Sequence, residues 1–322
     1  MDSDPMNPSQ TPPALKKFYT LYLEAGKKNG FSPEKMNSVF AYFCKLAAEH
    51  AQNPLHFQPF HKAIRAPFDY YEFGHDFVRP LLDFSKSSLT GEDTLRAIEK
   101  TLATKENVIL LYNHQTEIDP QIISLFLEKK YPQLASEMIF VAGHRVVQDP
   151  LATPLSLGRN LFCIYSKKYI DHPSEKKAEK IQHNRRTLSI MEEMLSEGGK
   201  CICIAPSGGR DRMDESGKIL PSAFDPDSIE MLYLIAKKSG TACHFYPLSL
   251  YTYPLLPPPQ VINVELGEER STSFSPAHIA FGAEIDMEKI TQGITDKQAK
   301  RKLRAENIWQ QVVTAYKHFP SS

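Results

Sequence analysis

From residue 90 onward, apolar runs of strand length alternate with amphipathic runs of helical length, and no other feature constrains the fold as strongly. The predicted strands are residues 108–112, 138–142, 161–165, 201–205, 244–252 and 261–266, and the predicted helices are 92–103, 120–130, 175–197, 227–238 and 297–318. This alternation is typical of an α/β domain with a mixed, largely parallel sheet flanked by helices. Ligands of such sheets bind beyond the carboxyl ends of the strands, so the loops that follow the strands are the places to search.

The first 80 residues have a different pattern. Apolar residues recur at helical spacing over 14–25 and again over 33–53, and Ser32 and Pro33 fit the N-cap and first position of the second helix. Two amphipathic helices cannot bury both apolar stripes alone, and the aromatic-rich stretch 60–84 supplies one or two further short helices. We therefore predict a small N-terminal helical bundle domain over 1–80 and an α/β domain over 81–322.

Charge and cysteine content exclude several classes of protein. Lys+Arg and Asp+Glu number 38 each, so no global field draws this chain of 322 residues toward nucleic acid or an anionic membrane. The five cysteines lack CxxC spacing, which predicts buried, reduced thiols rather than a disulfide scaffold. Cys201 and Cys203 alternate onto one face of a predicted strand, where packing is favoured over a shared metal ion.

Targeting and membrane signals are also informative. The first residues, MDSDPMNPSQTPP, have neither an apolar signal core nor the arginine-rich character of a transit peptide, and no apolar run approaches the roughly 20 residues that span a bilayer. We predict a soluble, cytoplasmic protein with at most peripheral membrane contact, the alternative being the plastid stroma for a mature form that has lost its transit peptide.

A polar cluster follows the strand 108–112 directly, in the sequence VILLYNHQTEIDP of residues 108–120. On one continuous helix His114 and Asp119 would lie about 140° apart, so they can meet only if His114 ends the strand and a turn brings Asp119 back. A carboxylate bonded to one imidazole nitrogen fixes the tautomer, so that the other nitrogen can accept a proton. The structural alternative is that Asp119 and Pro120 are N-cap and first residue of a helix, and His114 a polar strand end.

A second loop follows the strand 201–205 and reads IAPSGGRDRMD over residues 204–214. Gly208 and Gly209 allow a tight turn with exposed amides, while Arg210 and Arg212 bring two guanidinium groups to one place, which suits a phosphate monoester. The GxxxxGK[ST] spacing of a nucleotide P-loop is absent. The structural alternative is a glycine turn with two solvated arginines.

A third loop follows the strand 161–165 and opens a local excess of basic residues. Seven lysines and arginines stand against three acidic residues over 167–186. Such a run is commonly a solvated helix face, but as a functional surface it would suit an acidic protein or a phosphate.

Four segments in this order resemble the motif blocks of the glycerolipid acyltransferases: NHQTEID, GRNLFCIYSKK, IAPSGGRDR and FYPLSLYTYPLLPPP. The resemblance is narrowest to the soluble glycerol-3-phosphate 1-O-acyltransferases of plant plastids and their bacterial relatives. It runs from about residue 90 to residue 270, and the N-terminal helices are similar to that family's small helical domain. APSGGRDR together with the upstream SKK is far more specific than His-x4-Asp alone.

The resemblance implies transfer of a fatty acyl chain from an acyl carrier protein or coenzyme A thioester to the sn-1 hydroxyl of glycerol 3-phosphate, with no cofactor and no covalent acyl-enzyme. It implies that His114 is the general base, that Asp119 orients its imidazole, and that the substrate phosphate is bound by Lys168, Arg210 and Arg212. Plant members carry histidine after the two lysines, where this chain has Tyr169.

The acyl chain requires an apolar groove, for which the candidates are Phe140, Leu157, Leu161 and the segment 248–256. The basic run 176–186 is the candidate dock for the acidic acyl carrier protein, with Lys176, Lys177 and Lys180 at its start. Three other functions stay open: a lysophosphatidate acyltransferase, a non-catalytic binder of a phosphorylated metabolite, and a metal-dependent phosphoesterase that uses His114, Asp119 and Glu117.

Overall fold

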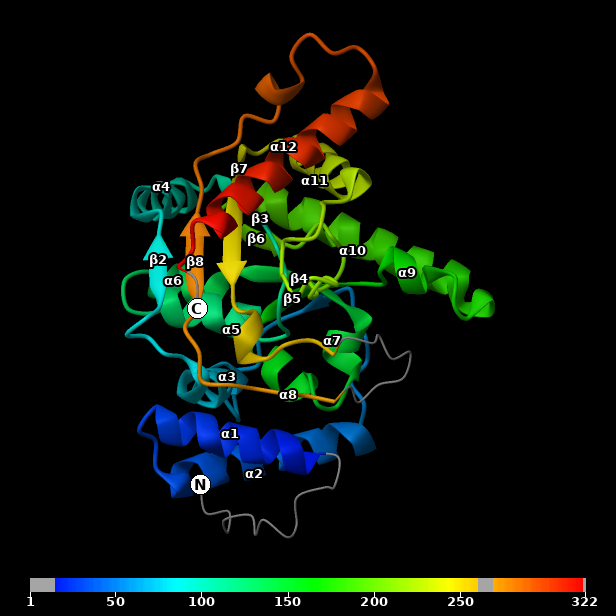
Figure 1. Cartoon of the computed structure of the whole chain (residues 1–322). Helices are drawn as coiled ribbons and strands as arrows, with labels where there is room; N and C mark the ends of the chain where they lie inside the picture. The colour runs from blue at the N-terminus through cyan, green and yellow to red at the C-terminus, as the bar shows by residue number, and fades with distance from the viewer. Residues whose placement is uncertain (1–14, 260–268, 321–322) are drawn as a thin grey trace.

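The computed structural model describes residues 15–259 and 269–320, and its centre is an eight-stranded sheet of order β1-β5-β4-β6-β3-β7-β8-β2. The five central strands, in the order β5-β4-β6-β3-β7, run parallel to one another, and β8 runs parallel to β2. The pairs β1–β5 and β7–β8 are antiparallel. Helices cover both faces of the sheet (Figure 1). The predicted α/β class with a mixed, largely parallel sheet is therefore confirmed.

The described strands are β1 (Phe60–His61), β2 (Ser88–Thr90), β3 (Asn107–Tyr112), β4 (Ile139–Gly143), β5 (Asn160–Ile164), β6 (Cys201–Ile204), β7 (Cys243–Tyr251) and β8 (His278–Phe281). The described α-helices are α1 (Lys16–Lys28), α2 (Pro33–Gln52), α3 (Tyr70–Val78), α4 (Glu92–Ala103), α5 (Asp119–Leu127), α6 (Pro132–Glu137), α7 (His144–Gln148), α8 (Thr153–Ser156), α9 (Lys167–Ile170), α10 (Lys177–Glu197), α11 (Pro226–Lys238) and α12 (Lys297–Lys317). The predicted strand 261–266 lies outside the described residues.

The central strand β3 is buried on both sides, and its side chains alternate between two hydrophobic clusters. Val108, Leu110 and Tyr112 belong to the cluster that includes residues of α1 to α6. Ile109 and Leu111 belong to the second cluster, which includes residues of α10, α11 and α12. Because successive side chains of a strand point to opposite faces, these two sets of helices lie on opposite faces of the sheet.

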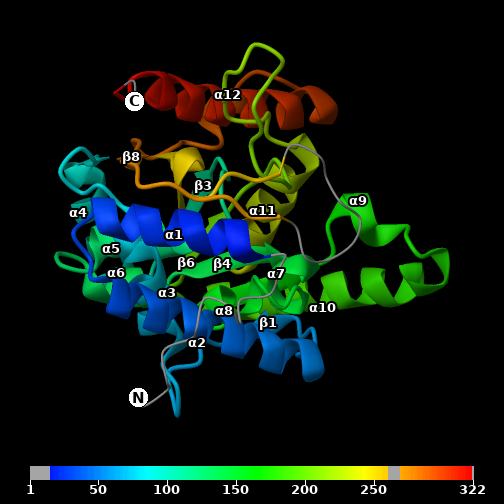
Figure 2. The ribbon, with the colours of Figure 1, turned by 60° about the horizontal axis from the view of Figure 1, so that its bottom comes forward.

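The N-terminal helices form as the pattern predicts. Ser32 caps α2 by accepting a hydrogen bond from the amide of Lys35, and α2 ends before Asn53. The apolar residues of α1 and α2 pack with those of α3 in the same cluster as β3, and Figure 2 shows α1 and α2 side by side at one side of the sheet. The boundary at residue 80 between two domains stays a prediction.

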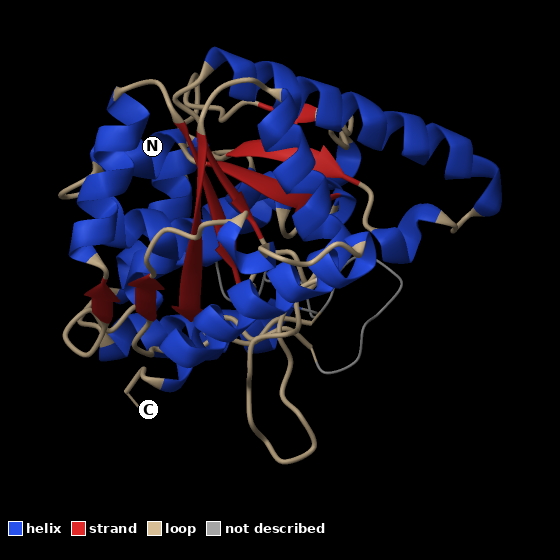
Figure 3. Ribbon diagram, turned by 90° about the horizontal axis from the view of Figure 1, so that it is seen from above, coloured by secondary structure: helices blue, strands red, loops and turns tan. Residues whose placement is uncertain are grey.

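The sequence pattern did not predict three short strands, β1, β2 and β8. The first two are the edge strands of the sheet, and β8 lies next to one edge. The two residues of β1 pair with β5, and β2 pairs with β8, which in turn pairs with β7. Figure 3 shows the resulting sheet from above, with its strong twist. Within the described ranges, no helix combines the length and apolar character that crossing a membrane requires.

A histidine at the start of β7 predicts a pH-dependent stability. His244 contacts Glu284 through Nδ1 at 2.7 Å and Glu106 through Nε2 at 2.8 Å. Burial alone would lower its pKa, but the hydrogen-bonded carboxylates of Glu284 and Glu106 outweigh burial and raise the pKa above its ordinary value of 6.5. The imidazolium therefore stabilises the folded protein fully below pH 6.5, and this contribution is lost as the pH rises through the folded-state pKa.

We expect His244→Gln to lower stability at pH 5.5 and to have a progressively smaller effect toward pH 8.5. Urea unfolding of both proteins across that range measures the difference. His318→Gln, on an exposed residue after the last turn of α12, is the matched control. A difference that is constant with pH would contradict the prediction.

Candidate active site

His114 and Asp119 meet where β3 ends. The Nδ1 atom of His114 lies 2.8 Å from Oδ2 of Asp119, and the two side chains are 24% and 0% exposed. Because the carboxylate accepts from Nδ1, the lone pair of Nε2 is left to accept a proton. The predicted turn that brings the two residues together therefore exists.

The carboxylate of Asp119 is held from several directions. Its Oδ2 atom accepts hydrogen bonds from the amides of Gln115 at 2.8 Å and Thr116 at 3.2 Å, and its Oδ1 atom accepts from the hydroxyls of Thr116 and Thr252 at 3.2 and 2.6 Å. The prediction that Asp119 is the N-cap of the following helix is wrong. The cap position is Ile118, and the carboxylate bonds backward to the turn rather than forward to its own helix.

Polar side chains that flank His114 join this turn to the rest of the site. Asn113 donates to Oδ2 of Asp211 at 2.9 Å and exchanges two hydrogen bonds with the backbone of Leu250 in β7. Gln115 accepts from the amides of Thr252 and Tyr253 at 2.7 and 3.0 Å. The strand end is thus locked to the carboxyl end of its neighbour β7.

Asp211, between the two arginines of the second loop, is fully buried and reaches the same network. Its amide donates to the carbonyl oxygen of His114 at 2.6 Å, and its Oδ1 atom accepts from the amide of Ser222 at 2.8 Å. Burial raises the pKa of Asp211, and hydrogen bonds from Asn113, Ser222 and Gln115 partly offset that rise. Sequence reasoning missed this residue, although an acidic residue between two arginines was the available signal.

Arg210 and Arg212 are half-buried on either side of Asp211, whose amide bonds to the carbonyl oxygen of His114. The Nε atom of Arg212 donates to the carbonyl oxygen of Pro259 at 3.3 Å, and its Nη1 atom donates to that of Arg210 at 3.2 Å. Gly208 adopts a φ of 71°, a conformation that favours glycine, in the turn that leads into this segment.

The third predicted phosphate ligand, Lys168, lies in α9 after β5, and its side chain is outside the described part of the structure. The neighbouring Lys167 is engaged in ion pairs. Its Nζ atom lies 2.8 Å from Asp225 and 3.2 Å from Asp227 at the start of α11. Tyr169 packs edge-on against the ring of His144, with 5.2 Å between the centroids.

The basic run 176–186 is only partly a surface. Lys176, Lys177, Arg185 and Arg186 are exposed, but Lys180 is buried and donates to the carbonyl oxygens of Tyr169 and His172. Including Lys180 in an accessible dock was therefore wrong, because this lysine serves the turn before α10. Figure 2 shows the start of α10 extending away from the body of the molecule.

Two other expectations for the site fare differently. Phe140, Leu157 and Leu161 are buried core residues, so they do not line an open groove for an acyl chain. Cys201 and Cys203 are buried in β6, as the packing interpretation predicts.

Across the described ranges, no three or more His, Cys, Asp or Glu residues are grouped as metal ligands. Glu117, which the phosphoesterase alternative requires, is bound instead by Arg270 at 2.6 Å.

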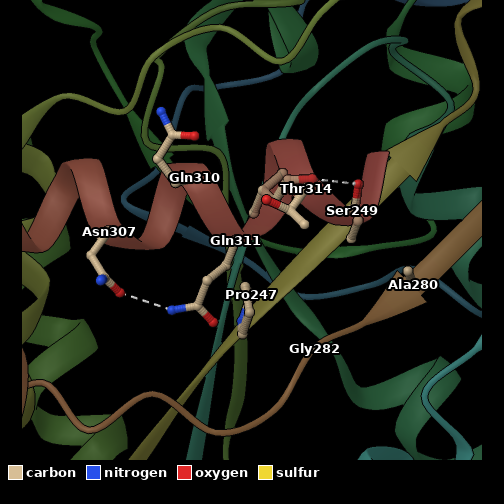
Figure 4. Close-up of a pocket in the computed structure, with 10 residues that line it drawn as sticks. Pro247, Ser249, Ala280, Gly282, Asn307, Gln310, Gln311 and Thr314 are labelled. Atoms are coloured by element: carbon tan, nitrogen blue, oxygen red, sulfur yellow. Dashed lines mark hydrogen bonds between the residues drawn. The ribbon is translucent and has the colours of Figure 1, made fainter. Parts of the chain in front are cut away.

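A groove of about 430 Å³ lies elsewhere, between α12 and the strands β7 and β8 (Figure 4). Pro247 and Gly282 line it from the strand side, and Gln310 and Gln311 line it from α12. None of the described residues that line this groove is charged, so the groove lacks the cationic groups that bind a phosphate.

Comparison with known proteins adds independent observations. A family model described as Acyltransferase matches residues 88–251. A chloroplastic glycerol-3-phosphate acyltransferase of Cucurbita moschata is 39% identical over 96% of this chain and 70% of its own length. Proteins of the same name from Arabidopsis thaliana and Spinacia oleracea are 38% and 36% identical over 82% and 94% of the chain. The chain spans 58% and 65% of the lengths of these two relatives.

The matched region includes β3 with the His114–Asp119 turn, the segment around Arg210 and Arg212, and most of the parallel sheet. The family model covers half of the chain, and the Cucurbita relative is matched over more than two thirds of its length. This chain therefore belongs to the glycerol-3-phosphate acyltransferase family.

Proposed function

We propose that this protein transfers a fatty acyl chain from a thioester to the sn-1 hydroxyl of glycerol 3-phosphate, giving lysophosphatidate. One observation carries the proposal most directly. The amide of Asp211, between Arg210 and Arg212, donates to the carbonyl oxygen of His114, so the candidate phosphate ligands and the candidate base lie on adjoining segments. Glycerol 3-phosphate combines an anionic group with a nearby hydroxyl, and these segments offer a chemical partner for each.

In the proposed mechanism, Nε2 of His114 takes the proton of the sn-1 hydroxyl as the oxygen attacks the thioester carbonyl carbon. Asp119 holds Nδ1–H and stabilises the imidazolium that forms. The carbon–sulfur bond of the tetrahedral intermediate then breaks, and the imidazolium returns the proton to the leaving thiolate. The chain moves directly from sulfur to oxygen, so no acyl-enzyme is formed.

The phosphate of glycerol 3-phosphate is proposed to bind Arg210, Arg212 and Lys168. Removing one charge-assisted hydrogen bond costs about 1.5–3 kcal/mol, which corresponds to roughly tenfold or more in affinity. We therefore expect Arg210→Ala and Arg212→Ala each to raise KM for glycerol 3-phosphate at least tenfold with a smaller change in kcat. Arg96→Ala, on an exposed residue of α4, is the control.

The same assay settles the regiochemistry, because chromatography separates 1-acyl from 2-acyl product. Unchanged KM values in both arginine variants would remove the phosphate assignment. A chain that binds glycerol 3-phosphate but forms no acylated product would favour the non-catalytic alternative. Acylation of lysophosphatidate in preference to glycerol 3-phosphate would favour the lysophosphatidate acyltransferase alternative.

The acyl donor is proposed to be acyl carrier protein or coenzyme A, and the exposed lysines before and at the start of α10 distinguish them. Acyl carrier protein is acidic, so reversing Lys176 and Lys177 to Glu should raise KM for its thioester much more than KM for the matched acyl coenzyme A. Lys177 already pairs with Asp171 at 2.7 Å, which makes Lys176→Glu alone an informative single variant. Equal effects on both donors would remove the dock.

The comparisons also bear on location. The relatives carry the word chloroplastic in their names, whereas the cytoplasmic prediction gains no support from them. We therefore infer that the plastid stroma, the alternative raised on the sequence, is the better proposal for this chain.

A further inference from the structure

An ion pair joins the turn of residues 113–119 to a segment more than 150 residues away. Arg270 contacts Glu117 with two parallel hydrogen bonds, from Nε to Oε1 at 2.6 Å and from Nη2 to Oε2 at 3.0 Å. The two side chains are only 7% and 14% exposed. The proposed acyl transfer assigns no step to either residue.

Glu117 lies inside the turn whose shape the His114–Asp119 pair requires. The carboxylate of Asp119 accepts from the amides at positions 115 and 116, so these amides must keep their direction for the pair to stay in register. Gln115 and Thr116 on the turn also bond through their side chains, to Tyr316 and to Asp119 respectively. Glu117 is the next residue, and its anchor is Arg270.

Arg270 also lies near a second strand-end loop. Its Nη2 atom is 4.0 Å from Oδ2 of Asp149, the residue that directly follows α7 in the loop after β4. Asp149 organises that loop, because its side chain accepts from the amide of Leu151 and its carbonyl oxygen accepts from those of Ala152 and Thr153. One guanidinium thus lies between carboxylates from the loops that follow β3 and β4.

The energetics favour an orienting role for this pair. A buried ion pair contributes little net stability compared with apolar residues of the same volume, because desolvation of both charges offsets their attraction. The planar guanidinium fork, in contrast, fixes both distance and direction in a way that a lysine ammonium does not. What such a pair supplies best is a defined geometry.

We propose that Glu117 and Arg270 are positioning residues that hold the 113–119 turn in the shape that aligns His114 with Asp119. This inference rests on the proposed function for its kinetic consequence. It predicts a loss of kcat rather than a loss of substrate affinity, because neither residue belongs to the Arg210–Arg212 segment.

The test compares Glu117→Gln and Arg270→Lys with a matched pair elsewhere in the chain. Arg79 and Glu128 form the same two-bond arrangement at 2.9 and 3.1 Å, between η3 (Arg79–Leu81) and the end of α5. We expect Glu117→Gln and Arg270→Lys to lower kcat at least tenfold with KM for glycerol 3-phosphate within about twofold. Glu128→Gln and Arg79→Lys break a more exposed pair, whose side chains are 25% and 35% exposed, and should lower the melting temperature by a smaller amount without lowering kcat.

Hydrogen exchange provides a readout that does not depend on activity. Peptides that cover residues 113–119 should exchange faster in Glu117→Gln and Arg270→Lys than in the wild type, and should be unchanged in the two control variants. Unchanged exchange in this turn, an unchanged kcat, or a rise in KM alone would each overturn the positioning role. A wild-type chain without acyltransferase activity would contradict the proposed function instead, and the exchange result would still decide whether the pair holds the turn.

Discussion

Replacing His114 with alanine is expected to lower kcat for acyl transfer about 10³-fold, the middle of the range for loss of a positioned general base. The dissociation constant for glycerol 3-phosphate should change by less than about threefold, because the proposed phosphate ligands lie on other segments. The fold should survive, since the side chain is 24% exposed. Steady-state kinetics and calorimetric titration of glycerol 3-phosphate measure the two effects separately.

His318→Ala is the control, because His318 is exposed and follows the last residue of α12. Its kcat should equal that of the wild type. Turnover by His114→Ala at the wild-type rate would refute the catalytic role of this histidine. Loss of glycerol 3-phosphate binding together with turnover would indicate instead that His114 contacts the substrate in its ground state.

Replacing Asp211 with alanine is expected to lower the free energy of unfolding by about 3 kcal/mol. The variant leaves the half-buried amide of Ser222 and one hydrogen of the buried Asn113 side chain without their acceptor. For a chain of this size such a loss lowers the melting temperature by about 5–10 °C. Calorimetry at neutral pH measures it.

Asp214→Ala is the matched control, three residues along the same loop. Asp214 is exposed, and its side chain accepts from the amides of Ser216 and Lys218 within a local turn. Because water can replace a lost partner there, we expect Asp214→Ala to lower the free energy of unfolding by less than about 1 kcal/mol. Equal melting temperatures for Asp211→Ala and the wild type would show that the buried network does not hold the loop.

Long periodic elements were predictable from the chain because their patterns are local. The predicted helix 92–103 coincides with α4, and the predicted strand 108–112 falls within β3. The strands β1 and β2 were missed because two or three residues are too few for an alternating pattern, and only their neighbours in the sheet make them strands. Lys180 was misjudged for a related reason, since carbonyl oxygens from a preceding turn bury it inside an otherwise exposed basic run.

The candidate site was predictable in part. His114 with Asp119, and Arg210 with Arg212, could be proposed because their residue types follow strand ends, where a parallel sheet gathers its loops. The direction of each polar side chain was not predictable. Asn113, His114 and Gln115 are adjacent and all polar, yet Asn113 turns to β7 and Asp211 while His114 turns to Asp119. Pairs such as Glu117 with Arg270 join segments too distant for any local pattern.

The burial of Asp211 has a consequence for how this loop can vary. Its carboxylate points into the protein, and the residues directly before and after it are two half-buried arginines. The buried Asp211 therefore fixes the backbone position of both arginines, one of which directly precedes it and one of which directly follows it. Exchanging an arginine for lysine would alter the strength of the site, whereas inserting one residue between 210 and 212 would shift one cation relative to the other. Length is therefore the property of this segment that tolerates change least.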